Sequence, residues 1–136
     1  MTNSELIAKA ASILKPKQIG NHLMGDVGCA LLTNSGNLYI GVCIDTFGGM
    51  GFCAEQNAIG AMITAGEYQI EKIVAVWRNG EGTLFVGAPC GRCREFIRQI
   101  AEGNLDTAVV LGMERTVKLR ELLPNYDWGS EKLHGM

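Results

Sequence analysis

Three cysteines at the starts of two predicted helices constrain the fold of this chain more than any other feature. Cys53 precedes an Ala-rich segment of helical character, and Cys90 and Cys93 open a second such segment directly after Pro89. One predicted strand, residues 70–77, lies between the two segments. A crossover of this kind can bring the starts of both helices to one edge of a sheet. We therefore expect the three thiols to meet there.

The remaining hydrophobic pattern predicts one more helix and four more strands. Apolar residues recur at helical spacing over residues 4–14, and short apolar runs cover residues 27–33, 38–44, 107–111 and 116–119. We expect the first two runs to form an antiparallel hairpin, and strands separated by a helix to be parallel. The order predicts a three-layer α/β/α sandwich with a five-stranded mixed sheet, formed by residues 1–136 as one domain.

Composition and charge narrow the class of partner. The chain has 136 residues and a net charge of −2, which gives no single-sign field of the kind that binds nucleic acid or acidic membranes. Its longest apolar run, residues 38–44, is far shorter than a membrane span. The sequence starts without the features of a signal peptide. We therefore expect a cytoplasmic protein with a small-molecule substrate, no long nucleic-acid partner and no membrane partner.

Five cysteines in such a chain favour metal binding or catalysis over disulfides, because cytosolic thiols stay reduced. Helix N-termini stabilise thiolates, and Cys90 and Cys93, three residues apart, share one helix face. With Cys53 they can hold one tetrahedral Zn²⁺ per chain and leave its fourth position to water, as catalytic zinc sites do. Glu55, two residues after Cys53, can then touch that water without binding the metal.

Two other interpretations of these cysteines remain open at this point. Cys90 and Cys93 also form a C-x-x-C pair, which is typical of redox sites at helix starts. A closed structural zinc site would need a fourth ligand, and neither histidine, His22 or His134, is near the motifs in sequence. The other two cysteines, at positions 29 and 43, lie within apolar runs and are expected to be small buried side chains.

The same motifs resemble those of the cytidine deaminase family, in its short form with three cysteine ligands. Residues 53–55 match the family's C-A-E, residues 89–94 match P-C-G-x-C-R, and residues 27–30 and 121–124 look like its V-G-A-A and E-L-L-P. The resemblance implies a cytidine deaminase-like fold, a homotetramer, and hydrolytic release of ammonia from a cytosine nucleoside. It also implies that Glu55 is the catalytic residue that carries protons between water, the ring and the leaving amine.

Three thiolates carry more negative charge than Zn²⁺ neutralises. Arg94 and Arg92 stand beside the ligands and are candidates to donate hydrogen bonds to sulfur. Members of the family often carry an arginine directly after C-A-E, where this chain has Gln56. We therefore expect the charge to be offset mainly by Arg94.

The substrate pattern departs from that of ordinary cytidine deaminases, which present Asn-x-Glu to the ribose at the end of the second strand. This chain has Cys43 and Asp45 there. A Phe followed by Gly-Gly, the missing arginine and a Tyr-x-Trp after E-L-L-P resemble the blasticidin-S deaminase branch instead. The candidate substrate contacts are Cys43, Asp45, Phe47, Ala54, Tyr126 and Trp128.

Three functions follow from these observations. The first is deamination of cytidine or deoxycytidine, and the second is deamination of a modified cytosine nucleoside such as blasticidin S. The third is a non-catalytic zinc- or nucleoside-binding role. Glu55 argues against the third, because a binding protein needs no carboxylate aimed at metal-bound water.

Overall fold

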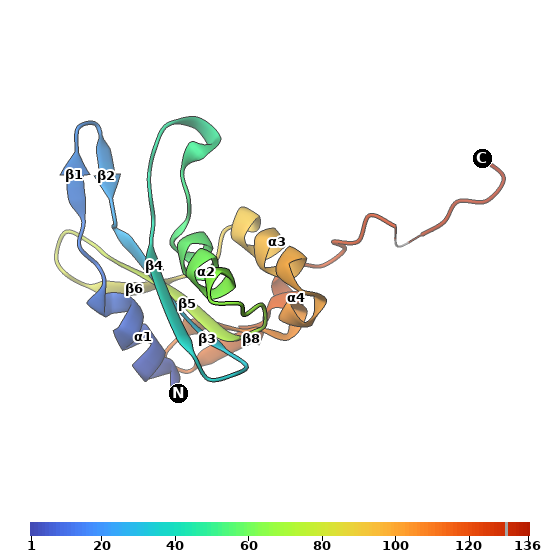
Figure 1. Cartoon of the computed structure of the whole chain (residues 1–136), viewed down its shortest axis with the longest axis horizontal. Coiled ribbons are helices and arrows are strands. Elements are labelled where there is room, and N and C mark those ends of the chain that lie inside the picture. The colour runs from blue at the N-terminus through green and yellow to red at the C-terminus, as the bar shows by residue number, and fades with distance from the viewer. Residues whose placement is uncertain (130) are drawn as a thin grey trace.

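A mixed β-sheet organises the chain, whose computed structural model describes residues 1–129 and 131–136 (Figure 1). The elements, in chain order, are α1 (Asn3–Ser12), β1 (Lys17–Ile19), β2 (His22–Met24), β3 (Val27–Thr33), β4 (Leu38–Val42), η1 (Gly48–Met50), α2 (Ala54–Thr64), β5 (Ile70–Arg78), β6 (Leu84–Gly87), α3 (Gly91–Ile100), η2 (Glu102–Asp106), β7 (Ala108–Gly112), β8 (Arg115–Lys118) and α4 (Leu119–Leu122). Within these described residues, no helix is long and apolar enough to cross a bilayer.

The sheet has six strands, so the predicted number of five is wrong. Its order is β4-β3-β5-β7-β8, with β6 also paired to β5. The missed strand, β6, has only four residues and follows a glycine-containing turn, which made it look like part of a loop. A separate two-stranded sheet, β1–β2, was missed for the same reason, because each of its strands has three residues.

The strand directions confirm the predicted crossovers. β4 and β3 form the expected antiparallel hairpin, and β3 is also antiparallel to β5. Consequently β4 and β5, which flank α2 in the chain, run in the same direction. β5 and β7, which stand before β6 and after α3 in the chain, pair directly and are parallel. Because β6 pairs with residues 75–78 at the end of β5, α3 begins near the same end of the sheet as α2.

Helices cover both faces of the sheet and confirm the three-layer α/β/α architecture (Figure 1). On one face, Leu6 and Ala10 of α1 pack against Val74 and Val76 of β5. The other face carries α2, α3 and α4. Its buried core comprises Cys29, Leu31, Cys43, Ala54, Ala58, Ile59, Met62, Ile70, Ile73, Ile97, Val109 and Leu119. The thiols of the two helix starts lie over this second face.

Gly41 allows α2 to approach β4 closely. A Cβ atom at Gly41 would lie 2.5 Å from the backbone nitrogen of Ala58 and 2.7 Å from Cβ of Asn57. The Asn57 side chain also donates a 2.6 Å hydrogen bond to the carbonyl of Val42, at the end of β4. Close packing and this bond together set the position of α2, and with it the position of Cys53 at its start.

Candidate active site

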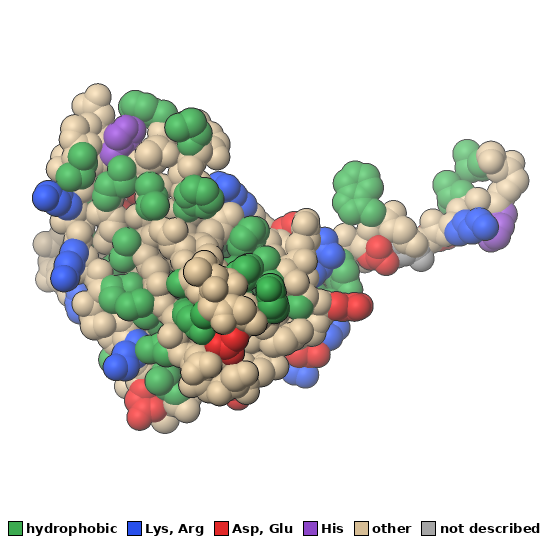
Figure 2. Space-filling view, in the orientation of Figure 1, with side chains coloured by type: hydrophobic (Ala, Val, Ile, Leu, Met, Phe, Trp, Pro, Cys, Tyr) green, Lys and Arg blue, Asp and Glu red, His purple; other side chains and the backbone are tan. Residues whose placement is uncertain are grey.

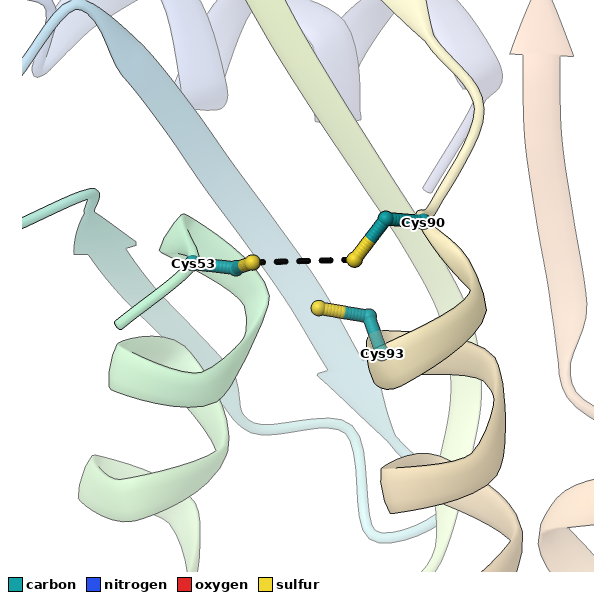
Figure 3. A group of neighbouring side chains, drawn as sticks. All are labelled: Cys53, Cys90 and Cys93. Atoms are coloured by element: carbon teal, nitrogen blue, oxygen red, sulfur yellow. Dashed lines mark hydrogen bonds between the residues drawn. The ribbon is translucent and has the colours of Figure 1, made fainter. Parts of the chain in front are cut away.

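The sulfur atoms of Cys53, Cys90 and Cys93 lie within 4.8 Å of one another (Figure 3). Cys53 and Cys90 are the N-cap residues of α2 and α3, and Cys93 follows in the first turn of α3. The sulfurs of Cys53 and Cys90 are 3.7 Å apart. Two sulfurs on one tetrahedral zinc, with bonds of about 2.3 Å, are about 3.8 Å apart. The donor set and its spacing therefore fit Zn²⁺, as the sequence predicts.

Burial and mutual contact control the ionisation of these thiols. Burial raises the pKa of Cys53, and burial followed by the charge of Glu55 raises the pKa of Cys93. Burial also opposes ionisation of Cys90, but hydrogen bonds from the Cys93 backbone and from the other two thiols lower its pKa. Cys90 therefore ionises most readily, and a divalent cation would supply the charge that lets the other two thiols ionise.

Glu55 lies in the first turn of α2 and is only 6% exposed. Burial raises the pKa of its carboxyl, although its backbone N–H and the Cys93 thiol act in the opposite direction. The carboxyl is close enough to the thiols for its charge to raise the pKa values of Cys53 and Cys93. A buried carboxyl with a raised pKa beside a metal site suits proton transfer near neutral pH.

A cavity of about 510 Å³ opens at this centre, and its volume lies within the range of small-molecule sites. Cys53, Ala54, Glu55 and Cys90 all line it. Two further predicted contacts, at positions 43 and 45, line the same cavity from the segment that follows β4. The structure thus brings three of the six candidate substrate contacts, Cys43, Asp45 and Ala54, together with the metal centre.

The three predicted aromatic contacts differ in their surroundings, and Phe47 lies between two residues of the cavity lining, Thr46 and Gly48. Phe47 packs edge-on against His22, with ring centroids 4.5 Å apart. The ring of Tyr126 lies 4.8 Å from the guanidinium carbon of Arg98. Trp128 is fully exposed in the C-terminal segment, which extends away from the sheet and helices (Figure 1). None of these three is among the described residues that line the cavity.

The two arginines beside the ligands contact backbone oxygens. Arg94 Nε donates to the carbonyl of Pro89 at 2.8 Å, and its Nη1 donates to that of Leu122 at 3.1 Å. Arg92 Nη1 donates to the carbonyl of Gly51 at 3.1 Å. In the described part of the chain neither guanidinium is hydrogen-bonded to a sulfur. Both arginines therefore brace the segments around the ligands, and their role in offsetting the thiolate charge stays a prediction.

The cavity also contains side chains that sequence reasoning missed, above all Asp26 and Trp77. Asp26 directly precedes β3, and Trp77 is paired across the sheet with Val27. Trp77 follows Ala75 by two positions, so its side chain is on the same face of the sheet. The alternation of side chains along β5 could therefore have placed Trp77 on the cavity side of the sheet. No sequence motif around Asp26 indicated that it belongs to a site.

The comparisons with known proteins agree with this geometry. The family model described as the cytidine and deoxycytidylate deaminase zinc-binding region matches residues 1–111. The chain belongs to this deaminase family. Blasticidin-S deaminase of Bacillus cereus is 34% identical over 103 residues, which are 72% of this chain and 74% of that protein. A cytidine deaminase of Shewanella sediminis is 31% identical over 111 residues, which are 79% of this chain but only 33% of that longer protein.

Solved structures of cytidine deaminases share the fold. The structure of the Burkholderia pseudomallei cytidine deaminase superposes with a TM-score of 0.73 at 28% identity, covering 92% of this chain and 98% of that one. A variant of the Mycobacterium tuberculosis cytidine deaminase superposes with a TM-score of 0.74 at 23% identity, covering 92% and 97%, and supports the fold alone. Together with the cysteine centre, family membership makes this protein a zinc-dependent hydrolytic deaminase.

Proposed function

We propose that this deaminase acts on the 4-amino group of a cytosine nucleoside, with cytidine and deoxycytidine as its reference substrates. One observation carries the proposal. The buried carboxyl of Glu55 and the thiols of Cys53 and Cys90 line a single cavity of about 510 Å³, which is large enough for a nucleoside. The names of the two relatives add support, since one is called a blasticidin-S deaminase and the other a cytidine deaminase.

Each residue of the centre has a defined task in the proposed reaction. Cys53, Cys90 and Cys93 hold zinc, which when bound supplies a Lewis acid that makes water a nucleophile at neutral pH. Glu55 accepts a proton from the attacking water and delivers it to N3 while C4 becomes tetrahedral. It then accepts the proton of the hydroxyl now on C4 and passes this second proton to the exocyclic amine. The C4–N bond breaks, ammonia leaves, and the uracil form remains.

The proposal is tested by replacing Glu55→Gln, which keeps the size of the side chain and removes its proton chemistry. We expect the variant to retain about one zinc per chain and to lose about 10²- to 10⁴-fold in kcat. Glu71→Gln, on the exposed side of β5, serves as the matched control and should retain full activity. A Glu55→Gln variant with unchanged kcat would remove Glu55 from the mechanism.

A second substrate, a modified cytosine nucleoside such as blasticidin S, is favoured by one feature. The cavity presents Cys43 and Asp45, and neither offers the amide that an Asn-x-Glu pair presents to ribose. Ultraviolet assays on cytidine, deoxycytidine, cytosine and blasticidin S, run in parallel, separate the candidates. Activity on blasticidin S alone would select the second candidate. A zinc-loaded protein that deaminates none of these four compounds would indicate a binding role.

We also propose that the chain acts as a homotetramer in the cytoplasm. Large apolar side chains that a partner could cover are exposed around the end of the molecule formed by β1, β2 and the β4–α2 segment (Figure 2). They comprise Ile19, Leu23, Ile44, Phe47, Met50 and Phe52. Light scattering should give a mass near four times 14.7 kDa. A fully active monomer would contradict the proposed assembly.

A further inference from the structure

A second cluster of reactive side chains lines the same cavity as the zinc cysteines. One carboxylate oxygen each of Asp26 and Asp45 and the sulfur of Cys43 lie within 4.8 Å of one another. All three residues belong to the cavity lining. They come from two segments, the residue before β3 and the residues after β4, which the antiparallel pairing of the hairpin brings side by side.

The Cys43 thiol fixes the geometry of this cluster. It is 5% exposed and donates a 2.9 Å hydrogen bond to Oδ1 of Asp26. It also accepts a 3.3 Å hydrogen bond from the backbone N–H of Val27. Oδ2 of Asp45 is 3.8 Å from the sulfur. Because a thiol has one proton, Cys43 can satisfy only one carboxylate at a time, and Asp45 is left with free acceptor capacity toward the cavity.

The charge around this cluster is uncompensated. Among the described residues that line the cavity, the carboxyl groups are those of Asp26, Asp45 and Glu55, and the one basic side chain is Arg92, which donates to the Gly51 carbonyl. Two neighbouring carboxylates repel unless a proton or a cation lies between them. Burial first, and then the hydrogen bond and charge of Asp26, raise the pKa of Asp45.

The same part of the cavity offers an aromatic face. Trp77 stacks on Phe85 with centroids 4.8 Å apart and an interplanar angle of 20°, yet it stays 41% exposed. Because Trp77 pairs with Val27, its indole lies next to the residue that follows Asp26. Carboxylates and an indole face together suit an organic cation.

We propose that Asp26 and Asp45 determine substrate specificity by binding a protonated amine or guanidinium on the sugar portion of the substrate. The inference rests on the proposed function, because it assumes that the pyrimidine amino group faces Glu55 and the zinc cysteines. The rest of the nucleoside then extends to the other residues of the cavity lining, where the two aspartates lie. Between the two candidate substrates of the proposed function, the aspartates thus favour modified cytosine nucleosides that carry a cationic sugar substituent over nucleosides with a neutral ribose.

Product analogues test the inference without turnover. Titration calorimetry compares uridine with 3′-amino-3′-deoxyuridine and 5′-amino-5′-deoxyuridine on the zinc-loaded enzyme, below the pKa of the amines. We expect at least one amino analogue to bind about 10- to 100-fold more tightly than uridine. Asp26→Asn and Asp45→Asn should each reduce that ratio toward one, while the control Glu71→Gln leaves it unchanged. Zinc content and melting temperature verify that each variant is folded.

The outcomes distinguish this inference from the proposed function. Equal or tighter binding of uridine, or a ratio that both Asn variants preserve, overturns the role of the aspartates. Two metal ions per chain, with the second lost in Asp45→Asn, would show that the cluster binds a metal ion instead. Preferential binding without deamination of any cytosine counterpart would contradict the proposed function alone. Failure to bind uridine and both amino analogues would contradict both.

Discussion

Replacing Gly41→Ala should displace the helix that carries the metal centre. The added Cβ atom would lie 2.5 Å from the backbone nitrogen of Ala58, whereas ordinary contact begins at 3.4 Å, so α2 must move by about 0.9 Å. The obstacle is backbone, which cannot rotate out of the way as a flexible side chain can. Overpacking of this kind costs about 1–3 kcal/mol of stability. Because Cys53 and Glu55 begin the same helix, the shift also reaches the reacting groups.

A displacement near 1 Å at a catalytic centre costs on the order of 10²-fold in rate. We therefore expect Gly41→Ala to lower both the urea midpoint and kcat/KM, measured by ultraviolet deamination assays. Gly60→Ala is the matched control, because it lies in the same helix with no neighbouring atom within 4 Å of its added Cβ. It should stabilise the protein by roughly 0.5–1 kcal/mol and leave kcat/KM unchanged. Wild-type activity and stability in Gly41→Ala would refute the argument that this close contact positions the centre.

Three further predictions concern the metal, the core and the pH dependence of stability. Cys90→Ala should lose the bound zinc, and metal analysis giving about one zinc per chain in this variant would contradict the ligand assignment. Asn104→Ala should reduce the free energy of unfolding by about 2–4 kcal/mol in urea titrations, because it leaves the N–H of Ile70 and the carbonyls that Asn104 bonds unpaired in the core. Hydrogen bonds from Tyr39, first, and from other side chains lower the pKa of Glu67 to about 2. The ionised Glu67 carboxylate therefore stabilises the fold above the ordinary pKa of 4.5, and this stabilisation is lost as the pH falls toward 2. The difference in the free energy of unfolding between wild type and Glu67→Gln should be largest near neutral pH and approach zero at low pH.

The fold was predictable where local signals agree with one another. The helices at α2 and α3 and the strands β3, β4, β5 and β7 follow from apolar periodicity and turn residues. Short elements escaped prediction, because the four residues of β6 and the three-residue strands β1 and β2 contain too few positions for a period to emerge. Their formation depends on partners elsewhere in the chain, and β6 exists because β5 has a free edge at residues 75–78.

The substrate end of the cavity was predictable only in part. Cys43 and Asp45, expected to contact the substrate, line the cavity, since they lie at and after the end of β4. Their contact with substrate stays a prediction. The aromatic residues chosen from motif resemblance, Phe47 and Trp128, lie outside the cavity lining. Trp77 lines the cavity in their place, because strand alternation and the pairing of β5 with β3 direct its side chain to that face.

The sequence by itself determined the metal chemistry. Three cysteines and a glutamate at two helix starts form a local signal, because residue type, helix N-termini and short spacing favour zinc ligands with a nearby carboxyl. The structure added the sulfur spacing that fits a single metal ion. Only the tertiary structure revealed Asp26 beside Cys43 and Asp45, and Trp77 beside them. Those contacts depend on strand register between segments that are distant in the chain, and a shift of one residue would turn each side chain to the opposite face. The type of reaction could therefore be predicted from local motifs, whereas the side chains proposed to select the substrate are brought together by the pairing of strands that are distant in the chain.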